Sequence, residues 1–225
     1  MMQLTEAHFA VLRRHMVEVI AIHVELAADE LGKASLEPRV LAAMRQVPRH
    51  RFVPAPLAPV AYQDMPLPIG FDKTISQPFV VAVMTDLLAP LPGDTVLEVG
   101  TGLGYQTAVL APLARQVWSV EIFEELALEA EERLRQVWVA NVAIRVGDGS
   151  RGWVEHAPFD RILVASAAER APQALVEQLR PGGRMVLPLG GTELQALTVL
   201  DKGMDGRVTQ RQLLPVRFSR LETMP

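Results

Sequence analysis

Three closely spaced glycines follow a strongly apolar stretch near the middle of the chain. The run Val96–Tyr105 reads VLEVGTGLGY, with glycines at positions 100, 102 and 104. Glycine lets a backbone turn tightly and approach a ligand without an intervening Cβ atom. Glu121 ends the next strand pattern, 21 residues after Gly100, where a carboxylate can accept hydrogen bonds from both ribose hydroxyls of a nucleoside. Together these features predict a site for an adenosine-containing ligand.

The spacing of the glycines distinguishes between nucleotide ligands. A dinucleotide site uses G-x-G-x-x-G, whereas this chain has G-x-G-x-G and places Tyr105 where the last glycine would fall. A phosphate-binding G-x-x-x-x-G-K-[ST] loop is absent from the sequence. The shorter motif fits S-adenosyl-L-methionine, whose nucleoside carries no pyrophosphate. A turn at Gly147–Ser150, after the third strand pattern, is placed to reach the adenine.

The pattern of apolar residues predicts the elements that must position this site. Residues 4–47 read as two or three helices, and the proline-rich stretch from Pro48 to Pro68 reads as an irregular segment. From Asp94 onward, short β-branched runs alternate with amphipathic helices, which is typical of a parallel sheet covered on both faces. The seven predicted strands are Thr95–Val99, Val117–Val120, Val142–Val146, Arg161–Ala165, Arg184–Leu189, Leu194–Leu200 and Leu213–Phe218.

Helices fit between the first four of these strands, most clearly at Tyr105–Leu113 and Phe123–Val137. The last two strands follow one another too closely for a helix, so an antiparallel edge is expected there. The predicted fold is therefore α/β: a Rossmann-like, doubly wound, mostly parallel seven-stranded sheet with an antiparallel edge and a helical N-terminal appendage.

Composition narrows the classes of function. The chain has 225 residues, no cysteine, and 22 Lys+Arg against 26 Asp+Glu, so thiol and zinc-thiolate chemistry are excluded and duplex nucleic acid is a poor partner. The five histidines lack ligand-pair spacing, so no metal site is predicted. The longest uncharged run, from Val99 to Ala114, is too short and too glycine-rich to span a bilayer. We therefore expect a cytoplasmic protein that uses neither membrane nor nucleic acid.

Several segments together resemble one family, the protein-L-isoaspartate O-methyltransferases. They are Thr74–Pro78 (TISQP), Val96–Ala108, Val146–Gly149, Phe159–Asp160 and Pro181–Arg184, with Val47–Pro54 and Pro66–Gly70 upstream. The resemblance covers roughly residues 38–218, and Thr74–Pro78 makes it specific, because the glycine turn and Glu121 mark only the wider class I methyltransferases. It implies transfer of a methyl group from S-adenosyl-L-methionine to the free carboxylate of L-isoaspartyl residues in damaged proteins, which starts repair through a succinimide.

The resemblance also implies roles for individual residues. Ser76 and Thr74 would be catalytic, facing the incoming carboxylate, with Ile75, Gln77 and Pro78 beside them as substrate-binding residues. An N-cap of the helix predicted at Pro78–Leu88 is a second reading of Ser76. The cofactor would be bound by Glu98, Gly100, Thr101, Gly102, Gly104, Glu121, Asp148 and Gly149.

The chain then divides into three regions of one structural domain. Residues 1–47 form the helical N-terminal appendage, residues 48–90 the substrate-side loop and helix, and residues 91–225 the S-adenosyl-L-methionine-binding core. Residues 4–36 lie largely outside the resemblance and are able either to pair two chains or to cap the sheet, so an oligomer is possible.

Three alternatives to this function stay open. The nearest is another class I methyltransferase on the same scaffold, which acts on a different carboxylate or a dedicated peptide. The others are a nicotinamide-dependent oxidoreductase, disfavoured by the missing third glycine, and a catalytically silent binding module. The sequence departs from the family pattern at Leu103, at Ala165–Ser166 and in the tail Val216–Leu221, which bears on peptide preference.

Overall fold

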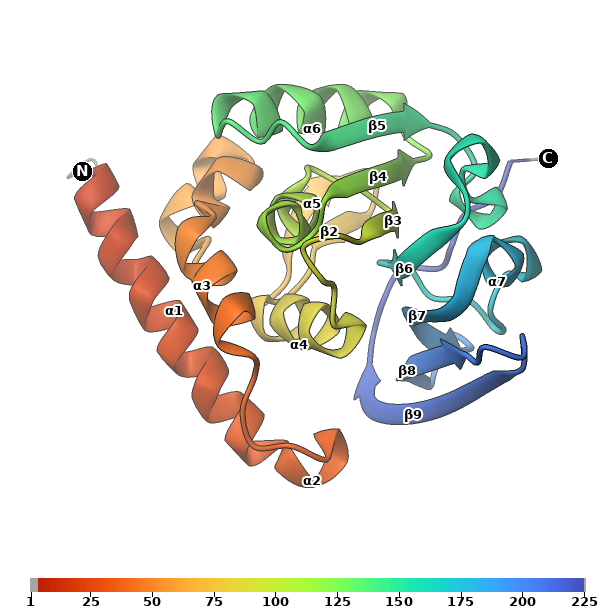
Figure 1. Ribbon diagram of the computed structural model, residues 1–225. Coiled ribbons are helices and arrows are strands. Elements are labelled where there is room, and N and C mark those ends of the chain that lie inside the picture. Colours follow the sequence, from red (N-terminus) through yellow and green to blue (C-terminus); the bar gives the residue numbers. More distant parts are fainter. Residues whose placement is uncertain (1–3, 225) are drawn as a thin grey trace.

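The computed structural model describes residues 4–224 and is built around one seven-stranded sheet. In the order β5-β4-β3-β6-β7-β8-β9, the first five strands are parallel and the last two form an antiparallel edge (Figure 1). The strands are β3 (Thr95–Val99), β4 (Gln116–Glu121), β5 (Val142–Val146), β6 (Phe159–Val164), β7 (Leu179–Gly190), β8 (Gln195–Lys202) and β9 (Val208–Val216). The predicted fold class and its antiparallel edge are confirmed.

The strand order reverses direction at β3. The chain first moves outward from β3 to β4 and β5, and then returns to the other side of β3 to form β6. Val99, the last residue of β3, is paired in register with Val120 on one side and Val164 on the other. Loops that leave the carboxyl ends of strands at such a point diverge and leave a crevice for a ligand.

Side-chain alternation in β3 separates two cores, because successive residues of a strand point to opposite faces. Val96 faces the larger core, where α4 (Pro78–Leu88), α5 (Tyr105–Leu110) and α6 (Glu124–Gln136) cover the sheet. Leu97 and Val99 face the smaller core, which includes residues of α7 (Gln173–Gln178). Helices therefore cover both faces.

The predicted helices are reproduced with one exception. The helix expected at Tyr105–Leu113 is α5 followed by a 3-10 turn at Ala111–Leu113, and the one expected at Phe123–Val137 is α6. A helix between β5 and β6 is not formed within the described residues. That connection consists of 3-10 turns at Gly149–Arg151 and Val154–His156, since its glycines and Pro158 interrupt a regular helix.

Of the three N-terminal helices, the first and third pack against α4, and the second lies against the first and β9. They are α1 (Glu6–Leu26), α2 (Ala28–Leu31) and α3 (Pro38–Gln46), and α1 runs along the outer rim of the molecule, at the left of Figure 1. Thr5 caps α1 in a reciprocal capping box with His8, although the ordinary Glu or Gln is replaced here by histidine. The buried stripe of α1, which includes Met16, Ile20 and Val24, joins the larger core.

The stretch predicted as irregular contains short elements. Two 3-10 turns, Arg49–Phe52 and Ala55–Val60, lead into a hairpin of β1 (Leu67–Gly70) and β2 (Lys73–Ile75). The two residues of the hairpin tip, Phe71 and Asp72, take positive φ angles of 52° and 54°. Neither is a glycine, so the usual sequence signal of a tight hairpin turn is missing at these two positions. Phe71 stacks on Phe123 at 4.8 Å between ring centroids, and this contact helps to hold the tip in place.

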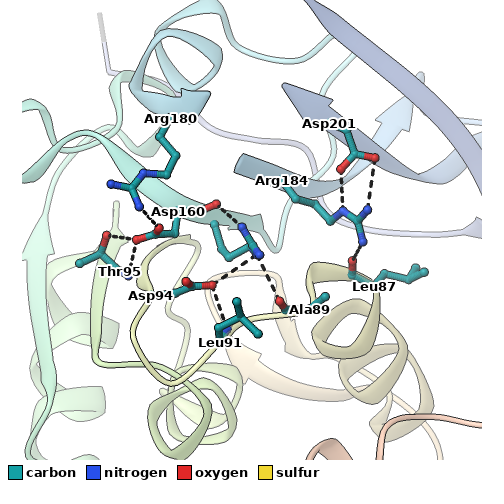
Figure 2. A network of polar contacts seen from close by, with 10 residues as sticks. Leu87, Ala89, Leu91, Asp94, Thr95, Asp160, Arg180, Arg184 and Asp201 are labelled. Atoms are coloured by element: carbon teal, nitrogen blue, oxygen red, sulfur yellow. Dashed lines mark hydrogen bonds and ion pairs between the residues drawn. The ribbon is translucent and has the colours of Figure 1, made fainter. Parts of the chain in front are cut away.

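A polar network fastens the amino ends of β3 and β6 and extends to β7 and β8. Asp160 accepts hydrogen bonds of 2.8 Å from the backbone and hydroxyl of Thr95 and pairs with Arg180 (Figure 2). Arg184 bonds Asp201 at 2.7 Å and the carbonyl of Leu87 at 3.1 Å, so β7, β8 and the end of α4 are tied together. The contacts lie at the opposite end of β3 from the crevice.

Arg49 anchors the segment between α3 and the hairpin. Its side chain is 0% exposed, its Nε donates to the carbonyl of Ala61 at 2.8 Å, and its guanidinium lies 4.8 Å from the ring centroid of Tyr105. Burial lowers the pKa of Arg49 to about 10, and the nearby Tyr105 and Asp64 oppose that shift. The arginine therefore remains charged at neutral pH and joins the irregular segment to α5.

We expect Arg49→Met to destabilise the protein by about 2 kcal/mol, because it removes the charged hydrogen bond to the buried carbonyl of Ala61. Urea unfolding measures the loss, and limited proteolysis should show new cleavage within residues 53–66. The neighbouring Arg51 is 50% exposed and pairs with Glu6, so Arg51→Met is a matched control expected to change stability by about 0.5 kcal/mol or less. Equal losses in the two variants would contradict the anchoring role.

Candidate functional site

A cavity of about 640 Å³ lies at the carboxyl ends of β3, β4 and β6. This volume is in the range of pockets that hold cofactors and drug-sized ligands, about 300–1,000 Å³. Segments far apart in the chain line the cavity: the glycine turn after β3, the end of β4 with the start of α6, the segment from β2 to α4, the loops after β5 and β6, and the C-terminal residues 214–222. The crevice expected from the strand order is thus enclosed by distant segments.

The glycine turn forms one wall. Gly100 and Gly102 line the cavity with positive φ angles of 92° and 55°, which side chains rarely adopt. A Cβ on Gly102 would also lie 3.1 Å from the side chain of Ile69 on the hairpin. Gly104 is placed differently: a Cβ there would meet Leu134 on α6 at 3.3 Å. Gly104 therefore serves helix packing, while the other two glycines form the wall.

Glu121 lies at the end of β4 with its carboxylate in the cavity wall. One oxygen accepts a 2.8 Å hydrogen bond from the amide of Gly102, and the other accepts from the amides of Ile122 (3.0 Å) and Phe123 (3.1 Å). Burial raises the pKa of Glu121, and these three amide donors counteract part of the increase. A carboxylate has about four acceptor positions, so these contacts leave capacity for a ligand hydroxyl.

Glu98 and Thr101 lie behind the turn. The β3–β4 register places Ser119 beside Glu98, and one Glu98 oxygen accepts hydrogen bonds from Ser119 (2.6 Å) and Thr107 (2.5 Å). Thr101 joins the same network through a 2.6 Å contact with the Ser119 hydroxyl. The second Glu98 oxygen has no hydrogen-bond partner within residues 4–224. Desolvation raises the pKa of this fully buried carboxyl to about 7, against hydrogen bonds that lower it.

The TISQP segment forms another part of the cavity wall. Thr74, Ser76 and Gln77 line the cavity, whereas Ile75 and Pro78 are buried and hold the segment against the core. Gln77, not Ser76, is the N-cap residue of α4, so the N-cap reading of Ser76 is wrong. The Ser76 side chain is half-buried and faces the same cavity as Gly100.

Asp64 orders this segment and was missed by the sequence reasoning. Its carboxylate accepts from the Gln77 side chain at 2.9 Å and from the Phe79 amide at 2.8 Å, and it contacts His23 of α1 at 2.6 Å. The tight packing explains why no motif reveals Asp64, since its partners are distant in sequence or are backbone atoms.

Asp148 and Gly149 follow β5. Gly149 lines the cavity, and any Cβ there would come within 2.3 Å of the Val99 side chain. The Asp148 carboxylate turns away from the wall: it accepts from the Ser150 amide at 2.9 Å and from the Met224 amide at 3.2 Å. Asp148 thus shapes the loop and holds the C-terminal tail.

The C-terminal tail is a larger part of the site than the sequence suggested. Residues 214–222 line the cavity, and backbone bonds between Ala167 and residues Ser219 (2.8 Å) and Leu221 (2.7 Å) hold the tail beside the loop after β6. An ion pair between Lys73 and Glu222 joins the tail to the hairpin. The only sequence signal for this role was the departure of Val216–Leu221 from the family pattern.

The loop after β6 contributes Ala165 and Ser166 to the cavity wall. Ala165 packs beside the turn, since a Cβ on Gly100 would lie 3.5 Å from the Ala165 Cβ. Leu103, the third departure from the family pattern, is buried in the larger core. Residues 4–224 contain no cluster of side chains that could hold a metal ion, and none of the helices they form is long and apolar enough to cross a membrane.

Comparison with known proteins identifies a family. Residues 23–223 match the family model described as protein-L-isoaspartate(D-aspartate) O-methyltransferase. The chain is 54% identical to protein-L-isoaspartate O-methyltransferase 1 of Polaromonas sp. strain JS666, over 97% of this chain and 93% of that relative. It is also 54% identical to a protein-L-isoaspartate O-methyltransferase of Anaeromyxobacter dehalogenans, over 88% of this chain and 96% of the relative.

Two solved structures share the fold at lower identity. A structure named protein-L-isoaspartate O-methyltransferase superimposes with a TM-score of 0.78 at 24% identity, covering 92% of this chain and 65% of that one. A second structure is described as a protein-L-isoaspartate O-methyltransferase from Plasmodium falciparum in complex with S-adenosyl-L-homocysteine. It gives a TM-score of 0.72 at 24% identity, covering 83% of this chain and 91% of that one.

The buried Glu98 carboxyl should make stability depend on pH. Its folded pKa of about 7 lies above its ordinary value of 4.5, so its favourable contribution is complete below about pH 4.5 and is lost as pH rises through about 7. Glu98→Gln removes this term. As the pH rises from about 5 to about 8, we expect the free energy of unfolding of the variant to increase by about 2 kcal/mol relative to that of wild type.

Urea unfolding at several pH values measures this difference. Glu125→Gln, on the exposed face of α6, controls for the loss of one carboxylate. Parallel stability profiles for wild type and Glu98→Gln across this range would show that Glu98 does not titrate as the buried geometry requires.

Proposed function

Because this chain belongs to the protein-L-isoaspartate(D-aspartate) O-methyltransferase family, we propose that it methylates the free carboxylate of L-isoaspartyl residues in damaged proteins, with S-adenosyl-L-methionine as methyl donor. The resulting ester closes to a succinimide without enzyme, and hydrolysis returns part of the product to normal aspartate. One observation carries the proposal: the TISQP segment faces the same cavity as the glycine turn and Glu121.

The cofactor side of the site lies at the carboxyl ends of β3 and β4. When bound, S-adenosyl-L-methionine supplies an electrophilic methyl group on a sulfonium sulfur. The cavity fits such a ligand because Gly100, Gly102 and Gly149 remove side chains from its wall and Glu121 presents a partly buried carboxylate for the ribose hydroxyls. Glu98, Thr101, Gly104 and Asp148 act indirectly, by fixing the loops that carry these residues.

The acceptor side is the TISQP segment. A carboxylic acid with a pKa near 4 is already ionised at pH 7, so the chain needs no general base. Methyl transfer then depends on alignment and the exclusion of water. The hydroxyls of Ser76 and Thr74 hold the acceptor carboxylate at the cavity, Gln77 contacts the substrate, and Ile75 and Pro78 fix the backbone that carries them.

This assignment gives each of the three regions a role. Residues 48–90 supply the acceptor side, residues 91–225 bind the cofactor, and residues 1–47 support the acceptor side from outside, for example through the contact of His23 with Asp64. The tail is shared, because residues 217–222 reach over the cavity toward the hairpin. Because the tail departs from the family pattern, one alternative function stays open, in which the same scaffold acts on another carboxylate or on a dedicated peptide.

Methyl transfer to matched peptides tests the proposed function. We expect label from S-adenosyl-L-methionine to appear, as a base-labile ester, on a peptide with L-isoaspartate and not on the same sequence with L-aspartate. Cofactor binding without label on either peptide would favour the alternative acceptor. Failure to bind S-adenosyl-L-homocysteine would contradict the assignment of the glycine turn and Glu121.

Ser76→Ala should lower kcat/KM for the isoaspartyl peptide by about 10- to 1000-fold, because a positioned donor is lost while the nucleophile stays ionised. The affinity for S-adenosyl-L-homocysteine should stay near that of wild type. Ser35→Ala, at an exposed position between α2 and α3, is the matched control. Complete loss of turnover with folding and cofactor binding intact would indicate a chemical role for Ser76 beyond positioning.

A further inference from the structure

Asp64 joins helix α1 to the segment that carries Ser76. One carboxylate oxygen of Asp64 contacts His23 Nδ1 on α1 at 2.6 Å and accepts from the Gln77 side chain at 2.9 Å. The other oxygen accepts from the backbone amide of Phe79 at 2.8 Å. A carboxylate only accepts hydrogen bonds, so His23 Nδ1 donates to it. Gln77 and Phe79 line the cavity, whereas the other two residues of this cluster lie outside its lining.

Asp64 acts as a remote cap for α4. The helix begins at Pro78, which has no amide hydrogen, so the amide of Phe79 is the first donor that the helix leaves unpaired. Gln77, the N-cap residue, does not accept this hydrogen bond with its own side chain. Asp64 accepts it instead and places a carboxylate at the helix N-terminus, where the helix dipole favours it. The direction in which α4 begins therefore depends on the position of one carboxylate.

The start of α4 determines where Ser76 points. Ser76 lies two residues before Pro78, in the short stretch between β2 and the helix. Ile75 and Pro78 are buried on either side of it, and Gln77 is bonded to Asp64. A small rotation of the helix start would move the Ser76 hydroxyl within the cavity. A misplacement of about 1 Å is enough to slow a group transfer by about 100-fold.

His23 holds Asp64 from a helix that is fixed independently. Helix α1 lies against α3 and α4 and buries a stripe that includes Met16 and Ile20 in the larger core. The side chain of His23 is 40% exposed, and its ring meets the ring of Phe79 edge-on, with the centroids 5.9 Å apart. Because the buried stripe anchors α1 without His23, removal of this side chain should release Asp64 while the helix stays in place.

We propose that His23 is a positioning residue for methyl transfer, which acts through Asp64 to fix the start of α4 and with it the Ser76 hydroxyl. This inference rests on the proposed function, in which Ser76 faces the acceptor carboxylate. His23 lies outside the cavity lining, so it acts without touching the acceptor or the cofactor. Its contribution is confined to the acceptor side, and the glycine turn and Glu121 bind the cofactor in the same way without it.

Acceptor kinetics of His23→Ala test this role. We expect kcat/KM for the L-isoaspartyl peptide to fall by about 10-fold or more, because the Ser76 hydroxyl is misplaced. The affinity for S-adenosyl-L-homocysteine should stay near that of wild type. A contact that serves only stability would instead change the free energy of unfolding, measured with urea, and leave the kinetics of the folded enzyme intact.

Two further variants sharpen this comparison. His15→Ala is the matched control, because His15 lies on the same helix with its side chain 72% exposed and pairs with Glu18. This variant should methylate the peptide as wild type does. His23→Asn places an amide nitrogen where Nδ1 lies, and it should recover most of the activity that His23→Ala loses.

Hydrogen exchange at the Phe79 amide provides a readout that needs no acceptor. The hydrogen bond to Asp64 protects this amide. His23→Ala should therefore speed its exchange, and His15→Ala should not. Exchange that is equally slow in wild type and His23→Ala would overturn the proposal, because the start of α4 would then be fixed without His23.

The double variant of His23→Ala with Asp64→Ala tests whether His23 acts through Asp64. Without the carboxylate His23 has nothing to hold, so the double variant should be no slower than Asp64→Ala alone. Additive losses, equal kinetics in His23→Ala and His15→Ala, or a parallel loss of affinity for S-adenosyl-L-homocysteine would each overturn the proposal. If wild type leaves the isoaspartyl peptide unlabelled, the proposed function fails, and exchange at Phe79 still decides whether His23 fixes the start of α4.

Discussion

The amide of Gly102 donates a hydrogen bond to the carboxylate of Glu121, and this contact joins the loops that leave β3 and β4. These loops meet where the strand order of the sheet reverses, so their relative position decides the shape of the cavity. Glu121 is held by three backbone amides at once, and it therefore presents a fixed carboxylate. Below the turn, Glu98 and Ser119 fill the space between strand and helix with hydrogen bonds. The wall is thus organised before any ligand binds, which reduces the ordering cost of binding.

The rest of the cavity wall depends on segments outside the seven-stranded sheet. The hairpin, the TISQP segment and the C-terminal tail reach the cavity from three parts of the chain and hold one another through side-chain contacts. Asp64 and Arg49 are central to this arrangement because each binds backbone groups of the 61–79 region. This division suits an enzyme that accepts a flexible peptide, since a rigid cofactor wall can face a wall built from loops.

The polar contacts that fasten the sheet lie away from the cavity. The Asp160–Thr95 contacts lie at the amino ends of the parallel strands β3 and β6, and the Arg184–Asp201 pair lies on the same side of the sheet, whereas the cavity lies at the carboxyl ends of the parallel strands. The N-terminal helices extend the larger core outward and leave one face of α1 in water. The loops of the site are therefore able to keep positive φ angles and a buried acid, because the strand ends on the other side of the sheet are well fastened.

The sequence by itself determined the sheet, its antiparallel edge and most helices, because apolar periodicity and glycine spacing are local properties. It also determined the glycine turn and Glu121, since both follow directly from strand ends. Only the tertiary structure decided which residues near these motifs reach the cavity. Glu98 and Gly104 belong to the motif but face the core, because side chains alternate along β3 and α6 packs against the turn. Asp64, Lys73 and the tail contact the site through partners far away in sequence, and only the packing of the whole chain brings such partners together.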